Sequence, residues 1–259
     1  MPFVDHQGIQ IHFEVEGEGP PIVLAHGLTG NTTFWRGYGY VDLLRDRFTV
    51  ILLDARGHGK SDKPHEAAAY DDQLMAGDVL AVLDALAIDE THYWGYSMGG
   101  YVGLHLAQLH PDRLISLVCG GTDPFYRADE SNEPSPLLEI FRRGVTEGID
   151  AVVEGMRSLA GSITPQYEER LRGLDPQAMV ACLERARCRP RYAEALLQMK
   201  LPCLFYAGER DGDAHDNWQA AVRLMPDARF VSLPGLGHVG ASGAVELIMP
   251  QALAFWTGL

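Results

Sequence analysis

Short apolar runs alternate with helical patterns along most of the chain, and this alternation is the strongest restriction on its fold. An apolar run without polar interruption is typical of a strand buried on both faces, as in a parallel sheet. A segment at residues 9–15 instead alternates apolar and polar side chains, which indicates a strand with one exposed face. The continuous runs lie at residues 22–25, 49–53, 92–94, 114–119, 203–207 and 229–233.

Helical patterns separate these runs. Apolar residues recur every three or four positions in residues 74–86, where Asp71 or Asp72 is placed to cap the helix. Residues 102–109 and 218–225 have the same spacing. Strands that alternate with helices predict an α/β fold with a mostly parallel sheet and helices on both of its faces.

One segment interrupts the alternation after the run at residues 114–119. Residues 129–136 are acidic and contain prolines, which is typical of a loop, and helical patterns follow at 137–144, 150–160 and 176–187. No buried strand is predicted between 124 and 190. We therefore expect an α/β core formed by residues 1–123 and 191–259, with residues 124–190 inserted as a small helical domain.

Charge and cysteine usage exclude several classes of protein. A formal net charge of −14 repels a polyanion, so a nucleic-acid partner is not expected. None of the four cysteines forms a Cys-x-x-Cys pair, so no metal site is predicted. The first residues lack the basic and apolar regions of a signal peptide, and no apolar run reaches the roughly 20 residues of a membrane span. We therefore expect a cytoplasmic protein without a membrane partner. The sequence does not indicate the oligomeric state.

The motif with the clearest chemical meaning is Gly-Tyr-Ser-Met-Gly-Gly at residues 95–100. It follows an apolar run and precedes a helical pattern, so Ser97 lies on a tight strand-to-helix turn. Small residues such as Gly95 and Gly99 relieve crowding at such a turn, and the serine hydroxyl then projects at the carboxyl edge of the sheet. This context predicts that Ser97 is a nucleophile. The alternative is a glycine-rich helix start that packs closely on the sheet.

Two glycine-rich segments resemble nucleotide-binding motifs, but each departs from its motif at one required residue. A dinucleotide-binding Gly-x-Gly-x-x-Gly motif requires glycine where Ser97 stands. The segment from Gly57 to Ser61 ends like a phosphate-binding loop, but Asp54 replaces the first glycine of that motif. No organic cofactor is therefore expected.

A serine hydroxyl needs a general base, and the base needs an acid that orients it. His238 is the best base because it follows the last strand run in a loop with glycines on both sides; His215 is its nearest rival. Asp211 is the preferred acid because it lies just after the strand at 203–207. Asp123 and Asp213 remain as rivals for the acid.

An oxyanion formed at such a site requires two backbone N–H donors. Met98, the residue after the nucleophile, supplies the first. The loop after the strand at 22–25 supplies the second, with Leu28 as the preferred donor. We expect His26 to shape this loop by hydrogen bonding and not to act as a base.

Taken together, these segments resemble the serine α/β-hydrolase superfamily in order and spacing. The resemblance covers the His26-Gly27 loop, the Asp-Ala-Arg-Gly-His-Gly-Lys-Ser-Asp stretch at 54–62, residues 95–100, 208–211 and Gly237-His238. Their chain order of Ser, Asp and His is the order of that superfamily. The resemblance implies an eight-stranded sheet with a helical cap after the sixth strand, and no cofactor. Dehalogenases and epoxide hydrolases of this fold place aspartate where this chain has Ser97.

The chain looks most like the small capped members: carboxylesterases, haloperoxidase-like enzymes, enol-lactonases and meta-cleavage-product hydrolases. The resemblance implies a carboxylesterase-like enzyme (EC 3.1.1) that cleaves an ester or lactone of a small, largely apolar molecule through an acyl-enzyme on Ser97. Two alternatives are a carbon–carbon bond hydrolase of meta-cleavage-product type and a ligand-binding receptor of this fold with slow turnover.

The substrate depends on the pocket walls and on the insertion. Candidate wall residues besides Leu28 are Trp35, Tyr96, Phe125, Tyr126 and Val239. The insertion concentrates arginines, one of which is a candidate to hold a substrate carboxylate; the alternative is a solvated surface paired with nearby acids. These arginines are Arg142, Arg143, Arg157, Arg170, Arg172, Arg185, Arg187, Arg189 and Arg191.

Overall fold

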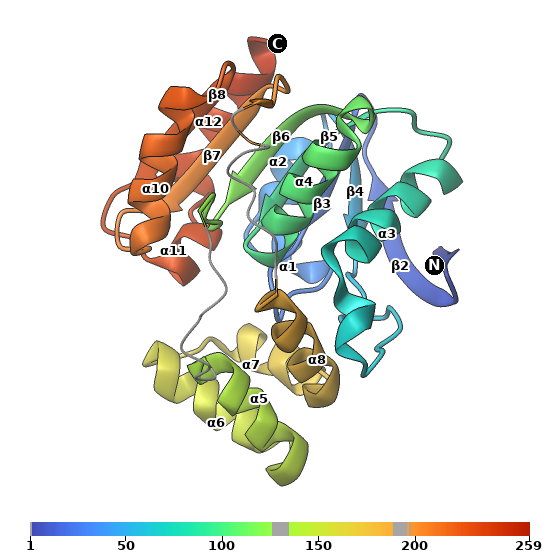
Figure 1. Cartoon of the computed structure of the whole chain (residues 1–259), viewed down its shortest axis with the longest axis vertical. Helices are drawn as coiled ribbons and strands as arrows, with labels where there is room; N and C mark the ends of the chain where they lie inside the picture. Colours follow the sequence, from blue (N-terminus) through green and yellow to red (C-terminus); the bar gives the residue numbers. More distant parts are fainter. Residues whose placement is uncertain (1, 126–134, 189–195, 197) are drawn as a thin grey trace.

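A single eight-stranded sheet forms the centre of the computed structural model, which describes residues 2–125, 135–188, 196 and 198–259 (Figure 1). The strand order is β1-β2-β4-β3-β5-β6-β7-β8. The first two strands pair antiparallel and β2 is antiparallel to β4, whereas all the other neighbours are parallel. This confirms the predicted α/β fold with a mostly parallel sheet. The strands are β1 (Phe3–His6), β2 (Ile9–Glu16), β3 (Pro21–Ala25), β4 (Thr49–Leu53), β5 (Thr91–Tyr96), β6 (Leu114–Gly120), β7 (Cys203–Gly208) and β8 (Ala228–Leu233).

Helices cover both faces of the sheet because successive strand residues point to opposite sides. On β5, Tyr93 packs into the cluster formed with α3, α4 and α10, while Trp94 packs into the cluster formed with α1, α2 and α12. Asp71 caps α3 by accepting a hydrogen bond from the backbone N–H of Gln73, as predicted for this start. These helices are α1 (Thr33–Gly37), α2 (Tyr40–Leu44), α3 (Asp72–Ala85), α4 (Met98–Leu109), α10 (Asp213–Ala221), α11 (His238–Ser242) and α12 (Val245–Thr257), with 3-10 turns η1 (Ala67–Tyr70), η2 (Pro111–Arg113) and η3 (Val222–Leu224).

Four helices described between β6 and β7, within residues 135–188, form a separate layer, which lies below the sheet in Figure 1 and which we call the cap. They are α5 (Pro136–Glu147), α6 (Ile149–Ala160), α7 (Pro165–Arg172) and α8 (Pro176–Ala186). Three of them begin with a capping side chain followed by proline, the strongest local signal for a helix start. The sequence did not predict α7, because its charged sequence has Leu171 as its one buried side chain.

The cap is packed onto the core. Phe141, Val152 and Met179 belong to the same apolar cluster as the residues of α3 and α4. Cys182 on α8 places its sulfur 3.8 Å from that of Met98, which opens α4. The cap therefore contacts the core next to the predicted nucleophile. The limits of 124 and 190 for this domain stay a prediction, because both connections include residues outside the described ranges.

No helix in the described ranges combines the length and the apolar character needed to cross a bilayer.

Candidate active site

Ser97 sits between β5 and α4 in a backbone conformation that L-residues rarely adopt, with φ 50° and ψ −113°. The turn is possible because the residues two positions before and after Ser97, Gly95 and Gly99, have no side chain. A Cβ on Gly95 would lie 2.3 Å from the carbonyl oxygen of Gly99, and a Cβ on Gly99 would lie 2.3 Å from that of Ala25. The glycines thus let α4 start directly against two strands, and the serine side chain projects from the turn.

His238 contacts both other residues predicted to act with it. Its Nε2 lies 3.1 Å from the Ser97 hydroxyl oxygen, and its Nδ1 lies 3.0 Å and 3.1 Å from the two carboxylate oxygens of Asp211. A carboxylate only accepts hydrogen bonds, so Nδ1 carries the proton and donates a hydrogen bond to Asp211. Nε2 is then the lone-pair nitrogen, which accepts a hydrogen bond from the serine hydroxyl.

Backbone contacts between the loop after β7 and the loop after β8 bring Asp211 and His238 together. The N–H of Arg210 donates to the Leu236 carbonyl at 2.8 Å, and that of Asp211 donates to Gly208 at 2.9 Å. A Cβ on Gly208 would lie 2.3 Å from the Leu236 carbonyl oxygen, so only glycine allows this approach. The Asp211 side chain is 11% exposed and that of His238 is 45% exposed, so the imidazole faces outward.

The rival residues have other partners. His215 bonds to the hydroxyl of Ser232 at 2.8 Å and to Asp216 at 2.9 Å. Asp123 accepts hydrogen bonds from the Asn217 amide at 3.0 Å and from the Phe125 backbone N–H at 2.8 Å. Asp213, the third rival, is the first residue of α10.

The two predicted oxyanion donors lie on segments that meet at Ser97. Met98 is the first residue of α4, and the first N–H groups of a helix have no partner within it. The loop containing Leu28 is equally near, since a Cβ on Gly27 would lie 3.4 Å from that of Ser97. A tight turn shapes this loop: the Gly30 N–H donates to the Gly27 carbonyl, and Thr29 has a φ of 66°.

His26 is buried and holds this loop from behind. Its Nδ1 donates to the Gly27 carbonyl at 2.8 Å, and its Nε2 accepts from the Ala55 N–H at 3.1 Å. Burial lowers the pKa of His26, which keeps the ring neutral so that both bonds form. Its neighbour His58, 5.2 Å away between ring centroids, has its pKa lowered to about 3 by burial and by His26.

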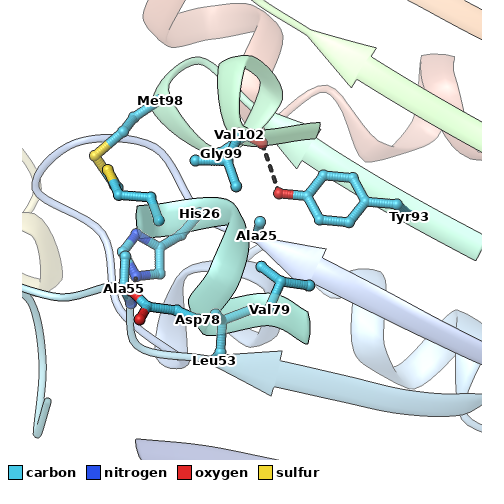
Figure 2. A pocket seen from close by; sticks show the side chains of 11 residues that line it. Ala25, His26, Leu53, Ala55, Asp78, Val79, Tyr93, Met98, Gly99 and Val102 are labelled. Atoms are coloured by element: carbon cyan, nitrogen blue, oxygen red, sulfur yellow. Dashed lines mark hydrogen bonds between the residues drawn. The ribbon is translucent and has the colours of Figure 1, made fainter. Parts of the chain in front are cut away.

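Figure 2 shows a small cavity behind this loop. It is lined by His26, Met98, Gly99 and Val102, among others, and the Tyr93 hydroxyl donates to the Gly99 carbonyl at one side. Neither Ser97 nor His238 lines it. This cavity therefore lies beneath the loop at residues 26–30, which we call the oxyanion loop after its predicted role, and it is not a route to Ser97.

The residues predicted for the pocket wall have different locations. The prediction for Trp35 is wrong: the short helix α1 turns it into the core, where it is 1% exposed and its ring contacts Tyr40 and Trp94. Phe125 and Val239 are exposed, whereas Leu28 is half-buried.

Tyr96 is buried and donates its hydroxyl hydrogen bond to the His238 carbonyl. Burial and the nearby Asp211 carboxylate raise the pKa of this phenol, so it stays protonated as a donor. Tyr126, like Arg189 and Arg191, lies outside the described residues.

Sequence reasoning missed one contact between the cap and the oxyanion loop. Arg170 on α7 donates from Nε to the Thr29 carbonyl at 3.0 Å, and the Tyr167 hydroxyl lies 3.3 Å from that of Thr29. No local pattern could have found it, because the residues are 141 positions apart.

Within the described ranges, no three His, Cys, Asp or Glu side chains are grouped so as to bind a metal ion.

A parallel sheet with a strained serine at one strand end, and with a histidine and an aspartate from later loops, defines the class of α/β hydrolases. The chain belongs to the α/β-hydrolase fold family, whose model matches residues 20–157, more than half of the chain.

The similar proteins are named for different hydrolytic reactions. The fluoroacetate dehalogenase of a Burkholderia species is 34% identical, and the match covers 91% of this chain and 86% of that protein. The putative carbamate hydrolase RutD of Azorhizobium caulinodans is 34% identical over 45% of this chain; that match spans only 43% of the relative's length. Among solved structures, a thermophilic esterase from Thermogutta terrifontis is 27% identical, with a TM-score of 0.80 over 99% of this chain and 97% of its own.

Proposed function

We propose that the protein is a serine hydrolase that cleaves the carboxylic ester or lactone bond of a small substrate. The observation that carries this proposal is the continuous hydrogen-bonded series from Asp211 through His238 to Ser97. A serine hydroxyl is a weak nucleophile unless a base accepts its proton, and these three side chains provide that base and its orientation.

In the proposed reaction, the Ser97 oxygen bonds to the substrate carbonyl carbon while its proton passes to Nε2 of His238. The backbone N–H groups of Met98 and Leu28 donate to the resulting oxyanion. His238 then gives the proton to the leaving alcohol oxygen as the carbon–oxygen bond breaks, leaving an acyl group on Ser97. Water then attacks the acyl carbon while His238 takes a proton from it, and His238 returns that proton to the Ser97 oxygen as the bond between the acyl carbon and Ser97 breaks, which releases the acid.

Asp211 stabilises the imidazolium that forms twice in this cycle and keeps the proton on Nδ1. All of these steps use side chains and backbone groups of the chain itself, and none requires a metal or an organic cofactor.

The serine also argues against the reaction named for the dehalogenase relative. Displacement of a halide by a serine hydroxyl would form an ether, which has no carbonyl carbon for water to attack. The enzyme would then be blocked after one turnover. The esterase relative, with 27% identity over nearly the whole chain, supports acyl transfer instead.

A fluorophosphonate probe tests the nucleophile directly. We expect the probe to add to the peptide that contains Ser97, and we expect labelling to disappear in Ser97→Ala. Ser116, whose hydroxyl is buried in β6, provides a matched control, because Ser116→Ala should label normally. Unlabelled wild-type protein, or unchanged labelling of Ser97→Ala, would refute the proposal. A panel of p-nitrophenyl esters and lactones of graded acyl length, with Ser97→Ala as blank, then measures the substrate range.

A further inference from the structure

Most arginines of the cap have their charge balanced by a carboxylate. In α5 and α7 these side chains lie on the outer surface, where they bridge neighbouring turns and helices. The pairs are Arg142 with Glu139 and Glu184, Arg143 with Glu147, Arg157 with Glu168, Arg172 with Asp150 and Glu168, and Arg185 with Asp71.

Arg170 is different. Its Nε donates to the neutral carbonyl of Thr29, and within the described part of the chain no carboxylate pairs with it. Its guanidinium carbon lies 4.9 Å from the ring centre of Tyr167 and 5.8 Å from that of Phe34. Burial among these groups lowers its pKa, but an arginine keeps its charge at neutral pH. Among the described residues, the half-buried guanidinium of Arg170 thus contacts neutral groups and no carboxylate.

Two series of contacts connect this cation with the proposed reaction centre. On one side, Thr29 belongs to the same turn as Gly27, which lies against Ser97. On the other, the Phe34 ring stacks on Tyr96 with 6.4 Å between ring centres, and Tyr96 bonds to the carbonyl of His238. The guanidinium therefore lies beside the oxyanion loop, on the side of the core that faces the cap.

A guanidinium offers five N–H donors in a planar fork; the Thr29 carbonyl accepts from the one on Nε, and the phenol oxygen of Tyr38 accepts from another. The remaining donors suit a carboxylate, which accepts two parallel hydrogen bonds from arginine. A carboxylate here would also supply the negative charge that the protein does not.

We propose that Arg170 binds a carboxylate carried by the substrate, so that the enzyme prefers esters or lactones with a free carboxylate on the acyl part. This inference rests on the proposed serine-hydrolase function and narrows its substrate class. It replaces the expected largely apolar substrate with a monoester of a dicarboxylic acid or a lactone that carries a free carboxylate.

A simpler role for Arg170 is to fasten the cap to the oxyanion loop. The two roles differ in what a substitution does. Loss of a fastening residue weakens turnover of every ester alike, whereas loss of a carboxylate-binding residue changes the preference between a charged and an uncharged ester of the same shape.

The test compares 4-nitrophenyl hydrogen glutarate with 4-nitrophenyl pentanoate, in which a methyl group replaces the carboxylate. We expect the wild-type protein to prefer the glutarate ester, and the ratio of the two kcat/KM values to fall about 10- to 100-fold in Arg170→Gln. Arg170→Lys keeps the positive charge but not the planar set of donors, so its ratio should lie between those of the wild-type protein and Arg170→Gln. Arg172→Gln, an exposed arginine of the same helix with its own ion pairs, should keep the wild-type ratio.

An unchanged ratio in Arg170→Gln, or an equal loss on both esters, would overturn the inference. Binding of monomethyl glutarate to Ser97→Ala protein, measured by calorimetry, separates this failure from failure of the proposed function. Binding that is lost in Ser97→Ala/Arg170→Gln supports the carboxylate site even if the wild-type protein hydrolyses neither ester. No binding by Ser97→Ala overturns it even if fluorophosphonate labels Ser97.

Discussion

The hydroxyl of Tyr96 donates a hydrogen bond to the backbone carbonyl of His238. Tyr96 precedes Ser97 in the sequence, so this bond fixes the loop of the proposed base to the strand that carries the nucleophile. The Tyr96 ring also lies 5.4 Å from the His238 imidazole. The strand and the loop, 142 positions apart, are thereby held in one geometry.

Removal of this bond should reduce turnover without weakening substrate binding. In Tyr96→Phe we expect kcat to fall about 3- to 30-fold with KM changed less than twofold, because a shifted imidazole loses its approach to the serine proton. Steady-state kinetics on p-nitrophenyl esters measures both values. Tyr206→Phe, which removes a hydroxyl that bonds to Trp94 within the core, is the matched control and should retain kcat. Equal kinetics for the two variants would contradict this role.

Substitution of the two candidate acids should have very unequal effects. Asp211→Asn removes the charge that orients His238, and we expect kcat to fall by about 10⁴. Asp123→Asn should lower kcat less than fivefold, since Asp123 bonds to Asn217 and to the Phe125 N–H and not to the imidazole. If Asp123→Asn were the more damaging change, the assignment of the acid would have to be exchanged.

The glycine before the nucleophile should not tolerate a methyl group. A Cβ on Gly95 would lie 2.3 Å from a backbone oxygen, which only a shift of the helix start can relieve. We expect Gly95→Ala to lose at least about 2 kcal/mol of unfolding free energy and roughly 5 °C in Tm. Gly37→Ala has no atom within 4 Å of the new Cβ and should leave Tm unchanged or raised. Calorimetric melting of both variants checks this difference.

Buried neutral histidines should make the fold acid-sensitive. Burial lowers the pKa of His92 to about 4, below the ordinary value of 6.5 that applies in the unfolded chain. Between pH 6.5 and about 4 the unfolded chain binds a proton that the folded protein does not, so the unfolding free energy falls as pH falls. Each such histidine contributes about 1.4 kcal/mol per pH unit in this window.

His92→Gln removes one histidine that binds a proton on unfolding. This residue lies near the start of β5, at the opposite end of the strand from Ser97. We expect the slope of unfolding free energy against pH, measured by urea titration, to decrease by about one proton relative to wild type. His110→Gln, a half-buried residue after α4, is the control. A slope unchanged by His92→Gln would show that this histidine is protonated in the folded protein.

The sequence by itself predicted every strand except β1, the covering helices α3, α4 and α10, and the segments on which the proposed site residues lie. Buried parallel strands and covering helices have short-range periodicities, so the α/β fold follows from neighbouring residues. The glycines around Ser97 likewise favour a tight strand-to-helix turn there. The preferred positions of Asp211 and His238 followed from loops that begin at strand ends. The helix α7 did not follow, because its charged residues carry no apolar stripe.

Only the tertiary structure decided which distant side chains meet. Sequence spacing treated Asp211 and Asp123 as alternatives, and the contact of β7 with the loop before His238 brings one of them to the imidazole. The burial of Trp35 and the neutral surroundings of Arg170 likewise depend on segments far apart in the chain. A local pattern records the side chains on one element, whereas contacts between elements depend on how the sheet orders them and on where the cap packs.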